Sequence, residues 1–350
     1  MMNFWEGSED FDAAQAALHA AGLTDGLPVV PPTRARVNRM LADNGVAADD
    51  VVALVPPLYG EATWRDIAIN AVMAGCMHEY LPVVGAAVEA MTAPEFNLLG
   101  IATTTGSAWP ITIVNGPIAA RISMNCAANA LGPGNRANAS IGRAISFALR
   151  NIGGATPGEV DMATLGQPAK YTCCFAENAQ ASPWSPLHAE RGFAADDSAV
   201  TVVGISGTVE VVDSVSQTAA DLAQTFAQSM LIAGTRGTPG LLGGGEPLLV
   251  IPPELAALFA RDGYSKEAVK AAIFDGARFP LERLSPAVLN HMLTGMRGAG
   301  LKDPIAPLRI AQRADDVMIV VAGGVGVKAM FAPTWGGGTR AVSRRIADRR

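Results

Sequence analysis

The amino-acid sequence predicts an α/β protein in which mixed or parallel sheets carry helices packed on their faces. Short apolar segments alternate with segments of helical periodicity along the chain, as strands and helices do in this class. The chain has 350 residues, of which 49% are hydrophobic and 17% are charged, so it can bury a large core. This length suits two lobes, an N-terminal α/β lobe at residues 1–200 that carries the polar site and a C-terminal α/β lobe at residues 201–350 with glycine-rich loops.

The elements expected in the first part of the chain follow from apolar spacing, proline and glycine. Residues 1–22 place apolar side chains on one helical face, and Gly22 is suited to end that helix. Short apolar runs at residues 27–30 and 51–55 both end in a double proline and predict strands. Thr33 and Thr63 are suited to cap the helices that follow these two runs.

The clearest helix of the chain is expected at residues 138–151, where apolar side chains share one face and two glycines follow. Other helices are predicted at residues 81–91 and 219–233 and from Pro253, Ser265 and Ser285 onward. Strands are predicted at residues 111–114, 170–176, 200–212, 248–251 and 317–321. The glycine- and proline-rich residues 235–245 predict a hinge or linker.

The charge of the chain argues against two classes of partner. The net charge is −6, and the densest cationic run is the C-terminal set Arg344, Arg345, Arg349 and Arg350, so we expect no nucleic-acid footprint. No apolar run reaches transmembrane length, and the N-terminus is acidic where a signal peptide would be basic. We therefore expect a cytoplasmic protein that binds no membrane.

Cysteine usage and the shortage of charge give two further expectations. The four cysteines are Cys76, Cys126, Cys173 and Cys174, of which two are adjacent and none forms a CxxC pair, so free thiols in a reducing compartment fit best. Few charges remain to cover a free surface of this size. Either the core is large or part of the surface lies in an oligomer interface, and we expect a homo-oligomer.

A glycine-bearing loop at residues 132–138 leads directly into the clearest helix. A helix N-terminus attracts anions, and Arg136 can add a guanidinium fork for a carboxylate or phosphate. Arg136 and Asn138 are therefore candidates for binding a small anionic substrate. The alternative is a tight turn with an asparagine cap and a surface arginine, and the GK[ST] ending of a Walker loop is absent.

The second candidate lies at residues 170–191 and contains a thiol, an acid and an imidazole. If residues 170–176 form a strand, Tyr171, Cys173 and Phe175 face the core, and Cys174 faces a more open setting. Glu177 comes at the end of this strand, and His188 follows a loop that is rich in proline.

These residue types are the components of thiolate catalysis. An imidazole lowers the pKa of a thiol, and an acid or amide orients the ring or stabilises an oxyanion. The predicted catalytic residues are Cys174, His188, Glu177 and Glu190, and the predicted substrate-binding residues here are Asn178 and Arg191. The alternative is a small core cysteine and a histidine that satisfies a buried backbone group.

Two glycine-containing turns are weaker candidates. Thr104 and Ser107 lie in a hydroxyl-rich turn that suits a carboxylate or phosphate, and a polar hairpin loop is the alternative. Gly324, Gly326 and Ala329 match a dinucleotide fingerprint after a strand, but the chain ends before a second βα unit. No standard zinc spacing occurs. We therefore predict no cofactor and no metal.

Three segments carry a resemblance to an uncharacterised bacterial family. They are Asp25–Pro28, Leu131–Arg143, and Cys174–Asn178 with Ser182–Trp184. The resemblance covers most of the chain. Members of that family look like companions of the UGSC selenoprotein group, which is named for a Sec-Gly-Ser-Cys tetrapeptide. The resemblance implies a possible redox or selenoprotein partner, although this chain has no Gly-Ser-Cys and is not itself that redox subunit.

Three functional classes follow from these patterns. The first is a small-molecule enzyme of hydrolase or lyase type that acts on an anionic substrate through a site containing cysteine and histidine. The second is a subunit of a thiol or selenol redox system. The third is a non-catalytic ligand-binding or assembly protein.

Overall fold

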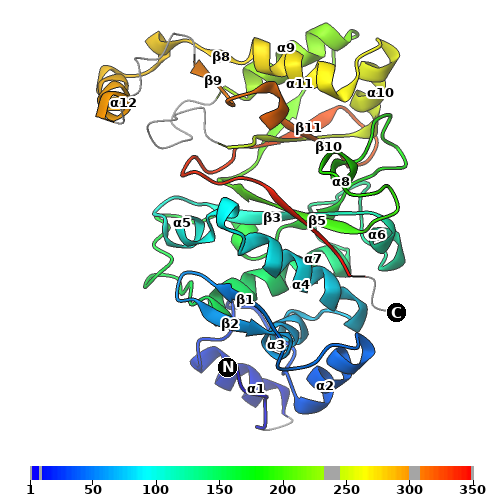
Figure 1. Ribbon diagram of the computed structural model, residues 1–350, viewed down its shortest axis with the longest axis vertical. Helices are drawn as coiled ribbons and strands as arrows, with labels where there is room; N and C mark the ends of the chain where they lie inside the picture. Colours follow the sequence, from blue (N-terminus) through cyan, green and yellow to red (C-terminus); the bar gives the residue numbers. More distant parts are fainter. Residues whose placement is uncertain (1, 8–9, 232–244, 299–307, 348–350) are drawn as a thin grey trace.

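The computed structural model describes residues 2–7, 10–231, 245–298 and 308–347. Over these residues two four-stranded sheets lie one above the other in the middle of the molecule, with helices outside each sheet (Figure 1). The predicted α/β class with mixed sheets is confirmed. The predicted hinge at residues 235–245 lies outside the described residues except for Gly245.

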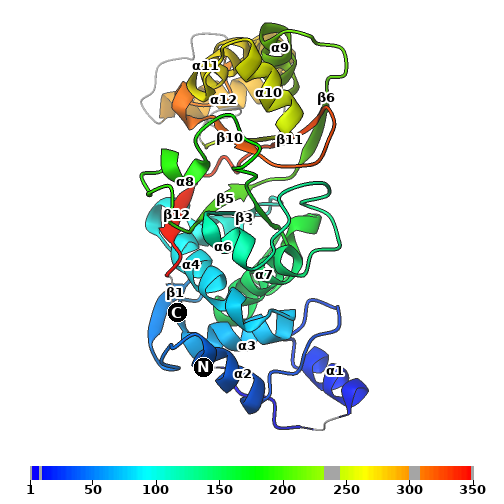
Figure 2. The same cartoon turned by 90° about the vertical axis from the view of Figure 1, so that its right-hand side faces the viewer.

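The first sheet has the order β12-β5-β3-β4. Its strands are β3 (Trp109–Asn115), β4 (Cys174–Ala176), β5 (Ala199–Ile205) and β12 (Val342–Arg345). β3 pairs with β4 in parallel and with β5 antiparallel, and β12 pairs antiparallel with β5. The C-terminal strand β12 therefore returns to the N-terminal half of the molecule, as both views show (Figures 1 and 2).

The second sheet has the order β10-β7-β11-β6. Its strands are β6 (Val209–Val212), β7 (Leu248–Ile251), β10 (Met318–Val321) and β11 (Lys328–Ala332). β10 pairs with β7 in parallel, and the other pairs are antiparallel. Two small hairpins complete the strands, β1 (Val51–Val55) with β2 (Gly60–Thr63) and β8 (Arg278–Phe279) with β9 (Leu308–Arg309).

The helices outside the first sheet are α1 (Phe11–Ala20), α2 (Arg34–Asp43), α3 (Trp64–Ala74), α4 (Leu81–Met91), α5 (Leu98–Thr103), α6 (Pro117–Arg121) and α7 (Arg136–Phe147). The helix α8 (Leu187–Glu190) lies beside the two sheets (Figure 2). The helices of the other half are α9 (Ala219–Ser229), α10 (Pro253–Arg261), α11 (Lys266–Gly276) and α12 (Pro286–Gly298). Short helical turns are η1 (His78–Tyr80), η2 (Pro94–Phe96), η3 (Ala148–Ile152, a π-helical turn), η4 (Pro168–Lys170), η5 (Leu281–Arg283) and η6 (Ala314–Asp316).

Three apolar clusters correspond to three interfaces between the layers. The middle cluster joins the two sheets, because Ile113 and Val203 of the first sheet are buried with Val250 and Val320 of the second. The other faces of the two sheets pack against their helices in two separate clusters. Both faces of each sheet are therefore covered, which explains why the strands are apolar at nearly every position.

Most of the expected elements are present, with three differences. Residues 27–30 form no strand, because this segment runs across α7 and accepts hydrogen bonds from the guanidinium group of Arg143 at the carbonyls of Leu27 and Pro28. The expected strand at 170–176 is limited to β4, because Lys170 ends η4 and residues 171–173 form a turn and irregular chain. The expected strand at 200–212 is divided into β5 and β6, which belong to different sheets. The lobe boundary predicted at residue 200 falls inside β5, and β12 belongs to the first sheet.

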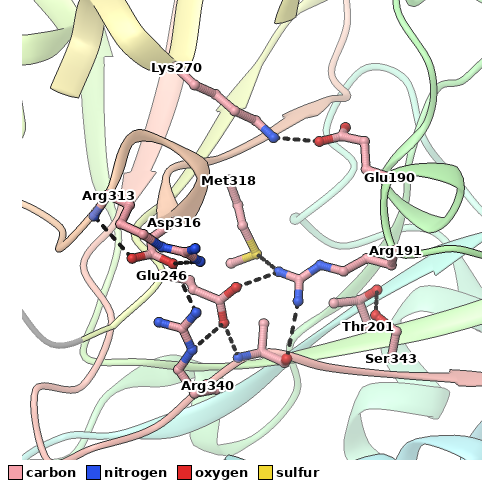
Figure 3. A network of polar contacts seen from close by, with 11 residues as sticks. Glu190, Arg191, Thr201, Glu246, Lys270, Arg313, Asp316, Met318, Arg340 and Ser343 are labelled. Atoms are coloured by element: carbon pink, nitrogen blue, oxygen red, sulfur yellow. Dashed lines mark hydrogen bonds and ion pairs between the residues drawn. The ribbon is translucent and has the colours of Figure 1, made fainter. Parts of the chain in front are cut away.

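A network of buried ions joins the two sheets at one side (Figure 3). Glu246 is buried and accepts hydrogen bonds from Arg191 at 2.8 Å and from the backbone nitrogen of Ala341 at 2.5 Å. Buried Asp316 binds Arg340 at 2.9 Å, and Arg340 lies 3.7 Å from Glu246. Segments far apart in the sequence are held together here, and Arg191 is engaged in this ion pair.

Candidate functional site

A cavity of about 570 Å³ lies beside the first sheet, at the C-terminal end of α7. This volume is in the range of small-molecule sites. The residues that line it come from the start of β3, from the end of α7 with η3, and from the irregular segment between η3 and β4. They are Asp25, Trp109, Ser146, Phe147, Arg150, Ala155, Pro157, Gly158, Asp161, Ala163, Leu165, Gly166, Gln167, Pro168, Lys170 and Tyr171. We call it the Lys170 cavity.

An ion pair between Lys170 and Asp161 forms part of the wall of this cavity. The Nζ atom of Lys170 lies 2.7 Å from Oδ1 and 2.6 Å from Oδ2 of Asp161. The two side chains are only 16% and 6% exposed, so water screens the pair weakly. The ammonium group also lies 4.8 Å from the ring centroid of Trp109, which is within range of a cation–π contact. The ammonium group is thereby held in one position.

Trp109 is itself fixed in the wall. It begins β3, is buried, and donates a hydrogen bond from Nε1 to Oγ of Ser146 in α7 at 2.9 Å. An indole face beside an ammonium group gives the cavity an apolar side and a cationic side. This combination suits a ligand that has an apolar body and an anionic group.

The loop at residues 22–28 and the helix α7 with η3 meet at the edge of the cavity. Arg143 of α7 makes a two-pronged ion pair with Asp25, with both hydrogen bonds at 2.7 Å. Arg150 of η3 donates to the carbonyl oxygens of Thr24 and of Gly22. Its buried Nε has no hydrogen-bond partner among the described residues. The loop at residues 22–28 is thus fixed to α7 through arginine side chains.

Two cations, Lys170 and Arg150, and two carboxylates, Asp25 and Asp161, line the Lys170 cavity. Arg143, which is not among the lining residues, forms an ion pair with Asp25, and Lys170 forms one with Asp161. These two ion pairs leave the charge of Arg150 unbalanced in the lining, and charge-assisted hydrogen bonds to lysine or arginine are the usual means of binding an anionic group. The ammonium and carboxylate groups of Lys170 and Asp161 also place a proton donor next to a proton acceptor.

Arg136 and Asn138 lie at the opposite end of α7 from this cavity. Twelve helical residues separate the two ends by roughly 18 Å. Asn135 caps the helix, and buried Asn138 donates to the carbonyl oxygens of Asn125 and Ala130 at 2.8 and 2.9 Å. Asn138 therefore holds the preceding loop in place, and its amide is engaged. Arg136 lines a different cavity.

Thr104 and Ser107 are absent from the lining of the Lys170 cavity. The hydroxyl of Thr104 accepts from the backbone nitrogen of Gly106 at 3.0 Å, and the hydroxyl of Ser107 donates to the carbonyl oxygen of Ser206 at 2.6 Å. The carbonyl of Ser107 accepts from Gln167, which lines the cavity. Asn178 accepts from the backbone nitrogen of Ala181 at 3.2 Å. These side chains shape turns in the structure.

The expected open, reactive setting of Cys174 is wrong. Cys174 is only 3% exposed and packs in the apolar cluster between the first sheet and its helices. Burial raises the pKa of this thiol well above its ordinary value, whereas the thiolate hypothesis requires a lowered pKa. Within β4, Cys174 and Phe175 do face opposite sides of the sheet, but helices cover the face that was expected to be open. Tyr171, which was expected on the core face, precedes β4 and is 50% exposed.

The other thiols are also protonated at neutral pH. Burial raises the pKa of Cys76 to about 12 and that of Cys173 to about 12, and it raises the pKa of Cys126 as well. Cys126 is partly exposed and has no such large shift. The four cysteines are free.

We predict that Cys126 is the first cysteine to react with iodoacetamide in the native protein at neutral pH, and that all four react slowly. The reactive species is the thiolate, so a thiol that is both accessible and least shifted reacts first. Peptide mapping after brief labelling gives the order, with labelling in urea as the control for intrinsic reactivity. Fastest labelling of Cys174 would contradict the buried setting.

Glu177 and Glu190 lie near two lysines of α11. Glu190 binds Lys266 and Lys270, and Lys266 also donates to the carbonyl oxygen of Ser185 at 2.8 Å. Both lysines are buried. Lys266 also acts on Glu177 by lowering its pKa. The structure thus brings these two predicted acids near the same lysines, which the sequence did not predict as their partners.

Several buried polar atoms of this acid–lysine cluster have no partner among the described residues. They are Oε1 of Glu177, Oδ1 of Asn115 and Nδ1 of His188. The other oxygen of Glu177 accepts from Asn115 at 2.5 Å and from the backbone nitrogen of Leu187 at 2.8 Å. Nε2 of His188 lies 3.3 Å from the carbonyl oxygen of Ala195. His188 is 1% exposed, whereas Ala195, whose carbonyl oxygen it contacts, is exposed.

Burial raises the pKa of Glu177, and Lys266 and the hydrogen bonds from Leu187 and Asn115 only partly oppose that effect. A carboxyl group whose folded pKa is raised stabilises the fold below its unfolded pKa, and this contribution is lost as pH rises through the folded pKa. We therefore predict that Glu177→Gln, which stays neutral, becomes more stable relative to the native protein as pH rises from about 4 to about 8.

Urea unfolding at the two pH values measures this difference. Glu177→Ala is the control, because it removes the acceptor of two buried N–H groups and should cost about 1–3 kcal/mol at pH 4. It also lacks the titrating carboxyl group, so its cost relative to the native protein should fall with rising pH by the same amount as in Glu177→Gln. If Glu177→Gln instead loses stability relative to the native protein as pH rises, the raised pKa is refuted.

The glycine match after β10 forms no dinucleotide site. A helix must follow the glycines in that motif. Here the chain turns back into β11, which pairs antiparallel with β7 and contains Ala329. Among the described residues, no three His, Cys, Asp or Glu side chains are gathered as metal ligands would be. No described helix is long and apolar enough to span a bilayer.

Sequence reasoning missed the roles of Lys170 and Asp161. They are nine residues apart in an irregular segment, so no periodicity relates them. One available signal was that Lys170 is the only lysine in the first 265 residues, in a chain that otherwise uses arginine for positive charge. Comparisons with protein-family models, with curated proteins and with solved structures found no match to this chain.

Proposed function

We propose that this protein is a small-molecule enzyme of hydrolase or lyase type that takes a partly apolar carboxylate into the Lys170 cavity. One observation carries the proposal: a nearly buried Lys170–Asp161 pair lies against Trp109 in the wall of a cavity of about 570 Å³. In the proposed role, the ammonium group binds the substrate anion and stabilises negative charge that develops in the reaction. Asp161 sets the position of that ammonium group and accepts a proton.

This assignment replaces the thiolate site that the sequence suggested. The raised pKa of Cys174 removes its nucleophile, and Lys170 supplies the positive charge that was assigned to Arg136. His188 with Glu177 stays a prediction for a second acid–base pair. Its support is that both side chains are buried and that each has an atom without a hydrogen-bond partner in the part of the chain that the structure describes.

Simple observations distinguish two other functions from the proposed enzyme. A subunit of a thiol or selenol redox system would need an accessible thiol or a selenoprotein partner, and turnover would depend on added dithiol. A ligand-binding or assembly protein would hold the carboxylate without changing it. The acid–base pair in the cavity favours the enzyme, because binding alone needs only the cation.

The test begins with mass spectrometry of small molecules released by denaturing the purified protein. A panel of monocarboxylates with apolar bodies is then screened by thermal shift, since a ligand that binds the folded state raises the unfolding temperature. We expect the shift in the native protein, its loss in Ala163→Trp, which fills the cavity, and its retention in Ala35→Trp, at an exposed site in α2. Binding that survives in Ala163→Trp would refute the proposed site.

We also propose a cytoplasmic location and a homo-oligomeric state. Four free cysteines support a reducing compartment. Large exposed apolar side chains support an interface, including Leu58 and Tyr59 near the β1–β2 turn and Leu165 at the cavity rim, which are 68%, 54% and 97% exposed. Sedimentation velocity distinguishes a monomer from an oligomer.

A further inference from the structure

The charged side chains that line the Lys170 cavity and the side chains at its mouth lie at different depths. Among the described residues of the lining, the charged ones are buried or partly buried: Asp25, Arg150, Asp161 and Lys170. The lining residues that are exposed carry no charge: Pro157, Gly158, Leu165, Pro168 and Tyr171. Charged side chains usually occupy the exposed positions of a protein, so this cavity reverses the usual order. Its ionic groups lie inside, and its mouth is apolar.

The apolar mouth is a fixed part of the fold. Leu165 is 97% exposed, and the chain around it is tied to the body of the protein. The backbone nitrogen of Thr164 donates to the carbonyl oxygen of Thr105 at 2.9 Å. The side chain of Gln167 donates to the carbonyl oxygen of Ile205 at 3.1 Å. These hydrogen bonds on both sides hold Leu165 at the mouth, where its side chain faces solvent.

Apolar side chains also line the interior of the cavity. Trp109, Phe147 and Ala155 are buried members of the lining. The indole of Trp109 lies beside the ammonium group of Lys170. A ligand that extends from this ammonium group to the mouth is therefore in contact with apolar side chains both in its middle and at its far end.

We propose that the substrate of the Lys170 cavity is an amphiphilic monocarboxylate of the alkanoate type, bound with its carboxylate inside and its apolar chain directed to the mouth. This inference rests on the proposed function and names the class of its substrate. A second charged group at the far end would lie against Leu165 and Tyr171, where the exposed lining residues carry no charge to pair with it. The end of an apolar chain instead removes these side chains from water, which is favourable.

Isothermal titration with hexanoate, octanoate and decanoate tests this inference, at concentrations at which the acids are monomeric. Each buried methylene group tightens binding by about fourfold, so each step of two carbons should improve the affinity by about fivefold or more. Decanedioate has the same number of carbons as decanoate and a carboxylate at both ends. It should bind about tenfold or more weakly than decanoate, because its second charge loses hydration without gaining a partner.

Leu165→Ser should weaken binding of decanoate by about fivefold or more and that of hexanoate by less than about twofold, because only the longer chain reaches the mouth. Val215→Ser is the matched control, since Val215 is 80% exposed and lies outside the lining. A second copy of the protein is the other candidate to cover Leu165, and sedimentation velocity of Leu165→Ser detects its loss.

Equal affinity for the three alkanoates would overturn this inference and leave the proposed function standing, as would decanedioate that binds as tightly as decanoate. A Leu165→Ser variant that dissociates a native oligomer and keeps the native dependence on chain length would also overturn it, because the mouth would then be an interface between copies. If no carboxylate of any length binds to the native protein, the proposed function fails together with the inference.

Discussion

Lys170→Met is expected to weaken binding of the carboxylate ligand by about 10- to 150-fold, which corresponds to the 1.5–3 kcal/mol of a charge-assisted hydrogen bond. Turnover of that ligand should fall below detection, because the same ammonium group stabilises the developing charge. Titration with the carboxylate identified by thermal shift measures the first effect, and product formation measures the second.

The matched control is Lys328→Met, which removes an exposed lysine of β11 from a different part of the molecule. Lys170→Met leaves Asp161 buried without its cation, so it is compared with the double variant Lys170→Met/Asp161→Asn, in which the pair is neutral. Native affinity in the double variant would show that Lys170 is present only to neutralise Asp161.

Glu246→Ala is expected to destabilise the fold by about 3–5 kcal/mol, because it leaves the cation of Arg191 without its buried partner. It also removes the acceptor of the backbone nitrogen of Ala341, immediately before β12. The loss should therefore include weaker attachment of β12 to the first sheet. Urea unfolding followed by circular dichroism measures the change.

Asp275→Ala is the control for this prediction. Asp275 binds Arg309 at 3.1 Å, but its side chain is 64% exposed, so its removal should cost less than about 1 kcal/mol. In the double variant Glu246→Gln/Arg191→Met both charges are gone, and much of the stability should return. A loss below about 1 kcal/mol in Glu246→Ala would mean that the network in Figure 3 contributes little to stability.

Local patterns predicted the α/β class and several elements because each pattern is contained within one segment. The periodicity at residues 138–151 becomes α7 with η3, and the apolar runs at 248–251 and 317–321 become β7 and most of β10. Local patterns could not predict which strands pair with one another. β5 joins β3 and β12, which lie some 90 and 140 residues away from it, and no local pattern specifies such partners.

The face of Cys174 illustrates a second limit. Alternation correctly separates Phe175 from Cys174, since they belong to the clusters on opposite faces of the first sheet. Alternation alone does not say that a face is open. When both faces of a sheet are covered, the residue opposite a core residue is also buried, and its thiol pKa rises where exposure and a nearby imidazole would have lowered it.

The candidate site depends on tertiary contacts in the same way. The candidate segment at residues 170–191 does contain Lys170, but the sequence does not show that Lys170 lies against Trp109 of β3 and beside Asp161. Glu177 and Glu190 lie close enough for their charges to interact, whereas the ring of His188 contacts the carbonyl oxygen of Ala195. The lysine partners of the acids come from α11, some 80 residues later, and engage the predicted carboxylate of Glu190.

The central claim is that the ligand lies against Trp109 in the Lys170 cavity. Labelling the protein with 5-fluorotryptophan gives one ¹⁹F resonance for each of its five tryptophans, and Trp109→Phe assigns the one that matters. On titration with the carboxylate, we predict a saturable shift of the Trp109 resonance, with little change in the others and no shift in Lys170→Met/Asp161→Asn. A saturable shift confined to another tryptophan, with Trp109 unmoved, would contradict the proposed site.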